Sequence, residues 1–500
     1  MNTLETHAAI LIVIIPLMSS YGIALLGLRW KGIGYFICLL AMGVSTVCSI
    51  VLLHRVLSQG TIHYHLGGWV PPWGIEYVID PLNGFMAVMV CFLSFLVTLA
   101  SKDSVEKELP DRKVRFYTIY LLLFTGLIGI VVTGDVFNVY VFLEIASLTA
   151  YALIAIGEDG APLAAFNYII MGTIGACFYL LGIGYLYIVT GSLNMADLGK
   201  LLPPLYQSKV VLIALAFFLI GLAIKMGLFP VHVWLPDAYT LAPSAVSAFI
   251  APLMTKVMAY IFIRIFLTVF QPTYALESVP VGTILSWVAA VAILAGSFLA
   301  IAQADLKRML AYSSVANIGF IVLGLGLANR LGLLGGLFHI LNHAFMKATL
   351  FLVASGIMYR LGRRNIYQLQ GLRRKMPWTM AAFTIATLSM IGVPPTAGFF
   401  SKLYLILGAI EAQQWFFIAV ILTSSLLNIV YFFRVIEITF FPPDEAGPSH
   451  PKAVEAMQRE EMPPRMLIPT LVCALGILLA GILNGWIFSH VLERVVPPGF

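Results

Sequence analysis

Charged residues are scarce in this chain. Asp, Glu, Lys and Arg make up 10% of its 500 residues, whereas soluble domains carry roughly 25%. Hydrophobic residues reach 60%. This composition excludes a soluble globular protein and a nucleic-acid-binding one. The five cysteines stand apart with no C-x-x-C pair, which argues against iron–sulfur or zinc ligation. We therefore expect no cofactor and no metal site.

Long apolar stretches recur along the whole chain instead. About 20 apolar residues cross the ~30 Å hydrocarbon core of a bilayer. Stretches of that kind lie near residues 6–28, 33–55, 80–101, 114–133, 136–157, 162–190, 208–229, 242–271, 280–302, 309–328, 331–359, 377–408, 413–441 and 466–491. The first lacks a basic start and a small-residue cleavage site, so we expect a retained helix. The predicted fold class is an all-α polytopic membrane protein of about fourteen transmembrane helices.

The basic residues predict the orientation. Lys and Arg accumulate in cytoplasmic loops. Of the 29 Lys and Arg, 18 fall in one set of loops and 5 in the other. Both termini should therefore lie outside the cytoplasm. The richer set includes Lys307 and Arg308, which we expect with Asp305 in a cytoplasmic turn. It also includes the loop from Pro442 to Arg465.

Six basic residues remain, all inside expected spans: Lys225, Lys256, Arg264, Lys347, Lys402 and Arg434. A charge at the bilayer centre costs ~2.5–3.5 kcal/mol even on the lenient insertion scale. Arg264 and Arg434 are expected to pair or to reach the interface. The four lysines are candidates for proton-carrying groups, and the alternative for each is a static salt bridge.

Glu144 is the one acidic residue that falls deep in an expected span. It requires a cation, and Lys225 is the expected partner. Burial favours the neutral form of a lysine, whereas a nearby carboxylate favours the charged form. The pair is thus a candidate proton switch, with a static clamp as the alternative.

Titratable groups also follow one another along a later helix. His339, His343 and Lys347 are spaced four residues apart, which places them on one helix face. Three such groups suit a proton relay. A haem site is the disfavoured alternative, because no second histidine pair stands on another span. Lys256 would precede this relay, and Lys402 is a candidate outlet.

Other polar residues have plainer explanations. Asp80 and Asp135 are expected at helix starts, where a carboxylate complements the helix dipole. His232 and Asp237 are expected in a loop after the seventh span. There they either gate a cytoplasmic entrance or simply cap the loop.

Two spans are interrupted by proline, near Phe229-Pro230 and near residues 392–395. Paired broken helices at equivalent places in two halves are typical of secondary transporters. The helix spacing predicts two inverted five-helix repeats, 114–271 and 280–441. Residues 1–113 would form the first three helices, and 442–500 a loop and helix 14. The alternative is that the prolines are ordinary kinks.

Four motifs carry a family resemblance. They are GLFPVHVWLPDA (227–238), LKRMLAYSS (306–314), NHAFMK (342–347) and PPTAGFFSK (394–402). Together they resemble the antiporter-like subunits shared by complex I, membrane-bound hydrogenases and Mrp-type multi-subunit Na⁺/H⁺ antiporters. The resemblance covers roughly residues 65–440 and implies the fourteen-helix fold with two inverted blocks. Within the family the chain is most similar to the D component of the Mrp-type antiporters.

The resemblance also implies roles for individual residues. It assigns Glu144 and Lys225 to the glutamate–lysine switch and Lys256 to the bridging lysine. His343 and Lys347 would form the second relay, and Lys402 the terminal lysine. The chain departs from the family at Asn167, where many members carry a lysine, and at Asn317, where several carry a histidine.

These observations predict a proton-translocating subunit of a multi-subunit monovalent cation (Na⁺)/proton antiporter in a prokaryotic inner membrane. Its partners would be other membrane subunits, protons, Na⁺ and the bilayer. The alternative is a proton-pumping membrane-arm subunit of a complex I-like or hydrogenase complex. A static scaffold is a third hypothesis. The chain shows no catalytic site of its own in any of them.

Overall fold

The computed structural model describes residues 3–27, 29–30, 32–157, 160–441 and 460–496. Most of the predicted loop from Pro442 to Arg465 lies outside these residues. Thirteen of the described helices are long and apolar enough to cross a membrane. The paired short helices α15 (Pro377–Ile391) and α16 (Ala397–Glu411) supply one more crossing. The predicted all-α polytopic membrane fold is therefore confirmed.

The N-terminal part contains three long helices and one hairpin: α1 (Thr3–Leu26), α2 (Ile33–Gln59), β1 (Ile62–His65), β2 (Glu76–Ile79) and α3 (Pro81–Glu108). The strands pair antiparallel, with Ile62 opposite Ile79. Next come α4 (Lys113–Val132), α5 (Val136–Ala155), α6 (Ala161–Thr190), α7 (Met195–Leu201), α8 (Lys209–Met226), α9 (Trp234–Leu241) and α10 (Ser244–Arg264), which a π-helical turn extends to Val269.

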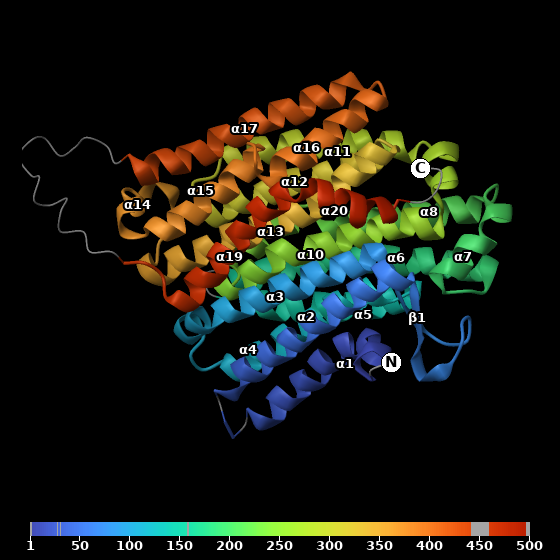
Figure 1. Ribbon diagram of the computed structural model, residues 1–500, viewed down its shortest axis with the longest axis horizontal. Helices are drawn as coiled ribbons and strands as arrows, with labels where there is room; N and C mark the ends of the chain where they lie inside the picture. The colour runs from blue at the N-terminus through green and yellow to red at the C-terminus, as the bar shows by residue number, and fades with distance from the viewer. Residues whose placement is uncertain (1–2, 28, 31, 158–159, 442–459, 497–500) are drawn as a thin grey trace, which may run out of the picture.

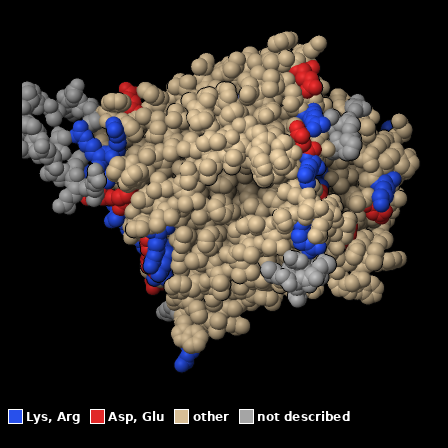
Figure 2. All heavy atoms as spheres, viewed as in Figure 1, with Lys and Arg blue, Asp and Glu red and all other residues tan. Residues whose placement is uncertain are grey.

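The remaining helices are α11 (Val281–Ile301), α12 (Leu306–Gly326), α13 (Arg330–Leu361), α14 (Leu372–Lys375), α15, α16, α17 (Trp415–Phe440), α19 (Pro464–Ile482) and α20 (Asn484–His490). The long helices run roughly parallel to one another in a single bundle (Figure 1). Both chain ends, β1 and α7 lie at one end of that bundle, and α14 lies at the other. On the face that Figure 2 shows, charged side chains gather near the two ends and the middle is uncharged.

Two crossings are broken in the middle, as the prolines predict. The chain leaves α8 at Gly227 and α15 at Gly392, both with positive φ, which glycine adopts without steric cost. Pro230 and Pro394 follow within three residues and cannot donate a backbone hydrogen bond. Each crossing then resumes as a second helix, α9 or α16. The breaks leave backbone carbonyls free inside the bundle.

One expectation about the first break is wrong. The sequence predicts Asp237 in a loop, but this residue lies in the first turn of α9, while His232 does lie in the break itself. The run resembles a loop because it contains two prolines. However, Pro236 stands in the first turn of α9. Backbone N–H groups there have no acceptor within the helix, so a proline costs no hydrogen bond.

The same local arrangement occurs twice along the chain. A Cβ on Gly126 would meet the backbone of Ala146, and a Cβ on Gly296 would meet Ala316 in the same way. Such glycines allow two membrane helices to approach closely. Asp135 immediately precedes α5, and Asp305 immediately precedes α12. The side chain of each accepts a hydrogen bond from the backbone N–H three residues later. Asp80 caps α3 likewise, so the expected positions of Asp80 and Asp135 at helix starts are confirmed.

Candidate functional site

Lys225 and Glu144 meet in the interior of the bundle. The Lys225 Nζ lies 3.6 Å from the Glu144 Oε1 and donates a 2.8 Å hydrogen bond to the Ser147 Oγ. Lys225 is 1% exposed, whereas the Glu144 side chain is 29% exposed. The cation is therefore enclosed by protein, and the carboxylate borders the outer surface of the chain. Ser147 was not predicted from the sequence, although its spacing of three residues from Glu144 places both on one face of α5.

Lys256 has no acidic partner. Its side chain is fully buried, and its Nζ donates to the Ala251 carbonyl at 2.6 Å and approaches the Thr255 hydroxyl at 3.3 Å. No carboxylate of the described residues lies within ion-pair distance of it. Helix α10 packs against both α8 and α13. Lys256 thus stands between the helix of Lys225 and the helix that carries the histidines.

The face of α13 predicted from the spacing is buried and polar. His339 reaches across the bundle, with its Nε2 3.0 Å from the Asn317 Oδ1 on α12 and its Nδ1 2.9 Å from the Ser401 Oγ on α16. One turn later, the His343 ring lies 5.9 Å from the His339 ring, centroid to centroid. Neither His343 nitrogen has a hydrogen-bond partner within the described part of the chain. A buried unpaired imidazole is costly and is free to take up a new partner.

Lys347 completes this face of α13. Its Nζ donates to the Leu310 carbonyl at 2.6 Å and to the Ser313 hydroxyl at 2.5 Å, both on α12. The residue is fully buried. Helix α13 packs against both α10 and α12. The structure therefore brings α10, α12 and α13 together around three titratable groups.

Lys402 binds the free carbonyls that the second break creates. It lies on α16, and its Nζ folds back to the Met390 and Ile391 carbonyls of α15 at 2.9 and 3.0 Å. A third bond, of 2.9 Å, goes to the Ser425 hydroxyl on α17. The C-terminal carbonyls of a helix carry partial negative charge. The break thus provides Lys402 with a polar site in which no carboxylate of the described residues takes part.

Further polar groups, missed by the sequence analysis, connect the second break to α13. The Asn342 amide donates to the Ser401 hydroxyl at 3.4 Å and accepts from the Ser389 hydroxyl at 3.1 Å. Because His339 also contacts Ser401, hydrogen bonds link α12, α13, α15 and α16. Single Ser and Asn residues in apolar helices were the available signal, but the sequence does not show which helix each one faces.

The two arginines behave as expected. Arg264 forms a bidentate pair with Asp80, at 2.5 and 2.8 Å. Burial alone would raise the pKa of the Asp80 carboxyl, but the adjacent Arg264 guanidinium lowers it below its usual value. Arg434 donates to the Ile301 and Gln303 carbonyls at the end of α11, at 3.0 and 2.6 Å. Both arginines are held by fixed partners near helix ends.

Lys307 corrects one expectation of the sequence analysis. The sequence predicts it in a cytoplasmic turn, but it lies in the first turn of α12 and is 4% exposed. Its Nζ donates to the Ala242 carbonyl at 2.9 Å and to the Ser247 hydroxyl at 3.1 Å. These groups belong to the junction between α9 and α10, so the junction anchors Lys307. A cavity of 340 Å³ opens beside it.

The two candidate gating residues lie near this junction, and each has different neighbours. Asp237 pairs with Arg308, Oδ1 to Nη2, at 3.2 Å. His232 is buried and packs against Phe229, and its Nδ1 has no hydrogen-bond partner among the described residues. The pair to Arg308 fixes α9 to the start of α12.

Comparison with known families matches residues 133–428 to the family described as NADH:quinone oxidoreductase/Mrp antiporter, TM. Among curated proteins, the chain is 48% identical to the N subunit of the NADH-quinone oxidoreductase of Desulforudis audaxviator, over 99% of both chains. It is 32% identical to the D component of the Na⁺/H⁺ antiporter of Alkalihalophilus pseudofirmus, over 79% of each.

Comparison with solved structures gives the same family of folds. The chain superposes on a chain of the Mrp complex from Dietzia sp. DQ12-45-1b with a TM-score of 0.87 at 25% identity, covering 99% of this chain and 97% of that one.

Proposed function

This chain belongs to the NADH:quinone oxidoreductase/Mrp antiporter transmembrane family, and from that premise we propose that its buried lysines and histidines carry protons within a multi-subunit cation/proton antiporter. The observation that carries the proposal is the pairing of Lys225 with Glu144 together with Lys256, Lys347 and Lys402, which are buried in the bundle and have no carboxylate partner among the described residues. Static scaffolds pair their buried charges. Groups that must exchange protons are left able to change charge.

The contacts support an order for the proton path. Glu144 and Lys225 form the switch on α5 and α8. Lys256 on α10 stands next, and the α13 face with His339, His343 and Lys347 follows. Lys402 ends the series at the second break. Movement of Glu144 away from Lys225 removes the charge that favours the protonated lysine, so a proton passes on when the pair opens.

The environment of Glu144 supports partner subunits at this face. Its side chain is 29% exposed, between the exposed apolar residues Val141 and Leu148 of the same helix. A carboxylate against lipid tails is costly. In the assembly that surface is covered by a neighbouring membrane subunit, whose own charges act on the switch. His232 and Asp237, at the α8–α9 break and on α9, are placed to gate access to Lys225.

The helix order supports two inverted repeats, residues 114–271 and 280–441. Each contains five crossings with the fourth one broken, and an odd number of crossings reverses the second block. The capping aspartates Asp135 and Asp305 pair with Asn194 and Asn365 at matching places in the two blocks. The end of the bundle that carries α14 is the cytoplasmic one, by its excess of Lys and Arg. Both termini then lie outside the cytoplasm of a prokaryotic cell.

A second candidate function is a proton-pumping subunit of a redox-driven membrane complex. The 48% identity to a protein named as part of an NADH-quinone oxidoreductase favours it. The same residues would carry protons in both cases. The difference lies in what drives the path: a cation gradient in one and electron transfer in a neighbouring subunit in the other.

The test is proton flux in vesicles that contain the intact complex, with wild-type chain, Lys225→Ala, or Lys209→Ala as a control. Lys209 begins the same helix but is exposed. Na⁺-driven flux without a redox substrate, abolished by Lys225→Ala and kept by Lys209→Ala, supports the antiporter. Flux that requires an electron donor supports the redox pump. Normal transport by an assembled Lys225→Ala complex under either drive would refute the proton path.

A further inference from the structure

A groove of 770 Å³ lies where α1 and α3 end and α2 and α4 begin. Four cations line it, together with the carboxylates Glu106 and Asp111; the cations are Lys102, Arg112, Lys113 and Arg115. None of the four takes part in an ion pair among the described residues. Because the cations outnumber the carboxylates, the groove carries a net positive charge.

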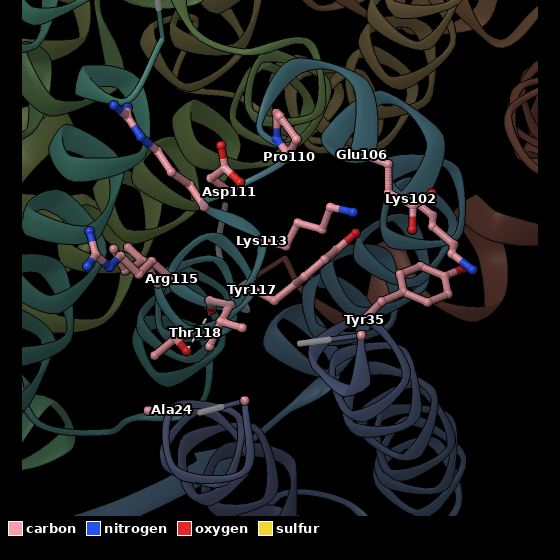
Figure 3. Close-up of a pocket in the computed structure, with 15 residues that line it drawn as sticks. Ala24, Tyr35, Lys102, Glu106, Pro110, Asp111, Lys113, Arg115, Tyr117 and Thr118 are labelled. Atoms are coloured by element: carbon pink, nitrogen blue, oxygen red, sulfur yellow. Dashed lines mark hydrogen bonds between the residues drawn. The ribbon is translucent and has the colours of Figure 1, made fainter. Parts of the chain in front are cut away.

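The cations are not equivalent. In Figure 3, the Lys113 side chain and the Tyr117 hydroxyl extend into the same open space, while Lys102 lies alongside Tyr35 and Arg115 extends away. The Lys102 Nζ lies 5.5 Å from the Tyr35 ring centroid. Tyr35 and Tyr117 are buried and pack edge to face, 5.8 Å apart. The Lys113 ammonium group and the Tyr117 phenol thus share one space, and Lys102 lies at its Tyr35 side.

The surface beside the groove is apolar and faces the bilayer. Leu25 and Phe36, on the ends of α1 and α2 next to it, are 71% and 59% exposed. Trp30, in the connection between these helices, is 55% exposed, as is typical of aromatic residues at headgroup level. A molecule bound here would meet cations with one end and hydrocarbon-facing side chains with the other. An amphiphile satisfies both surfaces.

We propose that this groove is a binding site for an anionic phospholipid. The phosphate lies between Lys102 and Lys113 and accepts a hydrogen bond from the Tyr117 hydroxyl, and the acyl chains run along Leu25 and Phe36. Basic pockets between membrane helices at the cytoplasmic side bind acidic headgroups in this way. The carboxylates that border the same groove disfavour a second anion. The lipid fixes the α1–α2 pair, which packs mainly on α3 and α4.

The test uses the intact complex in detergent, titrated with phosphatidylglycerol and followed by native mass spectrometry. The matched control is Arg363→Gln, an exposed cation at the same end of the molecule outside the groove. Lys102→Gln with Lys113→Gln should raise the dissociation constant for one phosphatidylglycerol by about 25-fold, since each cation near a lipid phosphate contributes about fivefold. Arg363→Gln should leave it unchanged, and Lys102→Arg with Lys113→Arg should retain the binding.

Other results would overturn the proposal. Phosphatidylcholine that binds as tightly as phosphatidylglycerol would show that the cations are not used. Displacement of the lipid by inorganic phosphate would indicate a small-anion site. Loss of a partner subunit in the double glutamine variant, with lipid binding kept, would make the groove a protein interface. Equal affinity of wild type and the double variant, both with the same melting temperature, would refute the site directly.

Discussion

Replacement of two buried lysines by leucine should have opposite effects on stability and the same effect on transport. Lys256→Leu removes a group that is fully buried and has no carboxylate partner among the described residues. A lysine charge at the bilayer centre costs ~2.5–3.5 kcal/mol, while its bond to the Ala251 carbonyl returns about 1.5–3 kcal/mol. The variant should therefore be as stable as wild type or up to about 2 kcal/mol more stable.

Lys225→Leu differs because it leaves Glu144 without its cation. Removal of one partner of a fully buried pair costs roughly 3–5 kcal/mol. Glu144 is 29% exposed, so part of that cost is relieved by its surroundings, and we expect a loss of about 2 kcal/mol. Both variants should lose proton flux, because each removes one carrier from the path.

The assay combines thermal unfolding of the purified complex with proton flux in vesicles. The two measurements should change independently in Lys256→Leu. Its melting temperature should stay the same or rise, while its proton flux falls. A Lys256→Leu complex that is clearly destabilised and still transports protons at the wild-type rate would refute the reasoning. It would show that the lysine is a structural group whose hydrogen bonds outweigh its burial.

Three further changes test other parts of the structure. Asp80→Asn should destabilise the chain by about 3 kcal/mol, since it leaves Arg264 buried and unpaired, and the double variant with Arg264→Gln should recover most of the loss in a double-mutant cycle. The pKa of Asp80 is lowered in the folded chain. The Asp80–Arg264 pair therefore stabilises the fold at pH values above the usual aspartate pKa, and this stability is lost as the pH falls through the folded pKa. The melting temperature of Asp80→Asn should lack this pH dependence. Gly296→Ala should destabilise by about 1–3 kcal/mol in thermal unfolding, because its Cβ would meet the Ala316 backbone at 2.6 Å. His343→Phe should keep the melting temperature close to wild type, since no hydrogen bond of the described chain is lost, but should slow vesicle proton flux at least tenfold.

The sequence predicts the membrane spans well because apolar length alone decides whether a segment crosses a bilayer. It also predicts the two breaks, since proline and glycine act locally. Helix α9 escaped prediction because Pro230 and Pro236 resemble a loop, although the second proline occupies a permitted first-turn position. Lys307 was predicted in a turn for a different reason. Its flanking charges suggested a cytoplasmic turn, whereas Ala242 and Ser247, distant in sequence, enclose it.

The charged residues of the candidate site were predicted from the sequence, whereas its hydroxyl-bearing residues were not. A lysine in an apolar span is conspicuous wherever it occurs, so the four lysines of the predicted spans could be singled out without a structure. Ser401 gave no such signal, because a serine is tolerated in any membrane helix. Its contacts with His339 and Asn342 depend on how α13 packs against α16, and that packing is decided by the whole bundle.

The burial of α10 and α13 has a consequence for how the chain is made. The membrane-crossing window of α10 is entirely buried and that of α13 is 94% buried, so neither helix touches lipid appreciably in the finished molecule. Each nevertheless carries a lysine, and α13 has the lowest hydropathy of the thirteen long helices. The insertion of such helices into the bilayer on their own is energetically unfavourable. During synthesis they must wait beside more apolar neighbours, and the bundle closes around them only after its later helices have emerged.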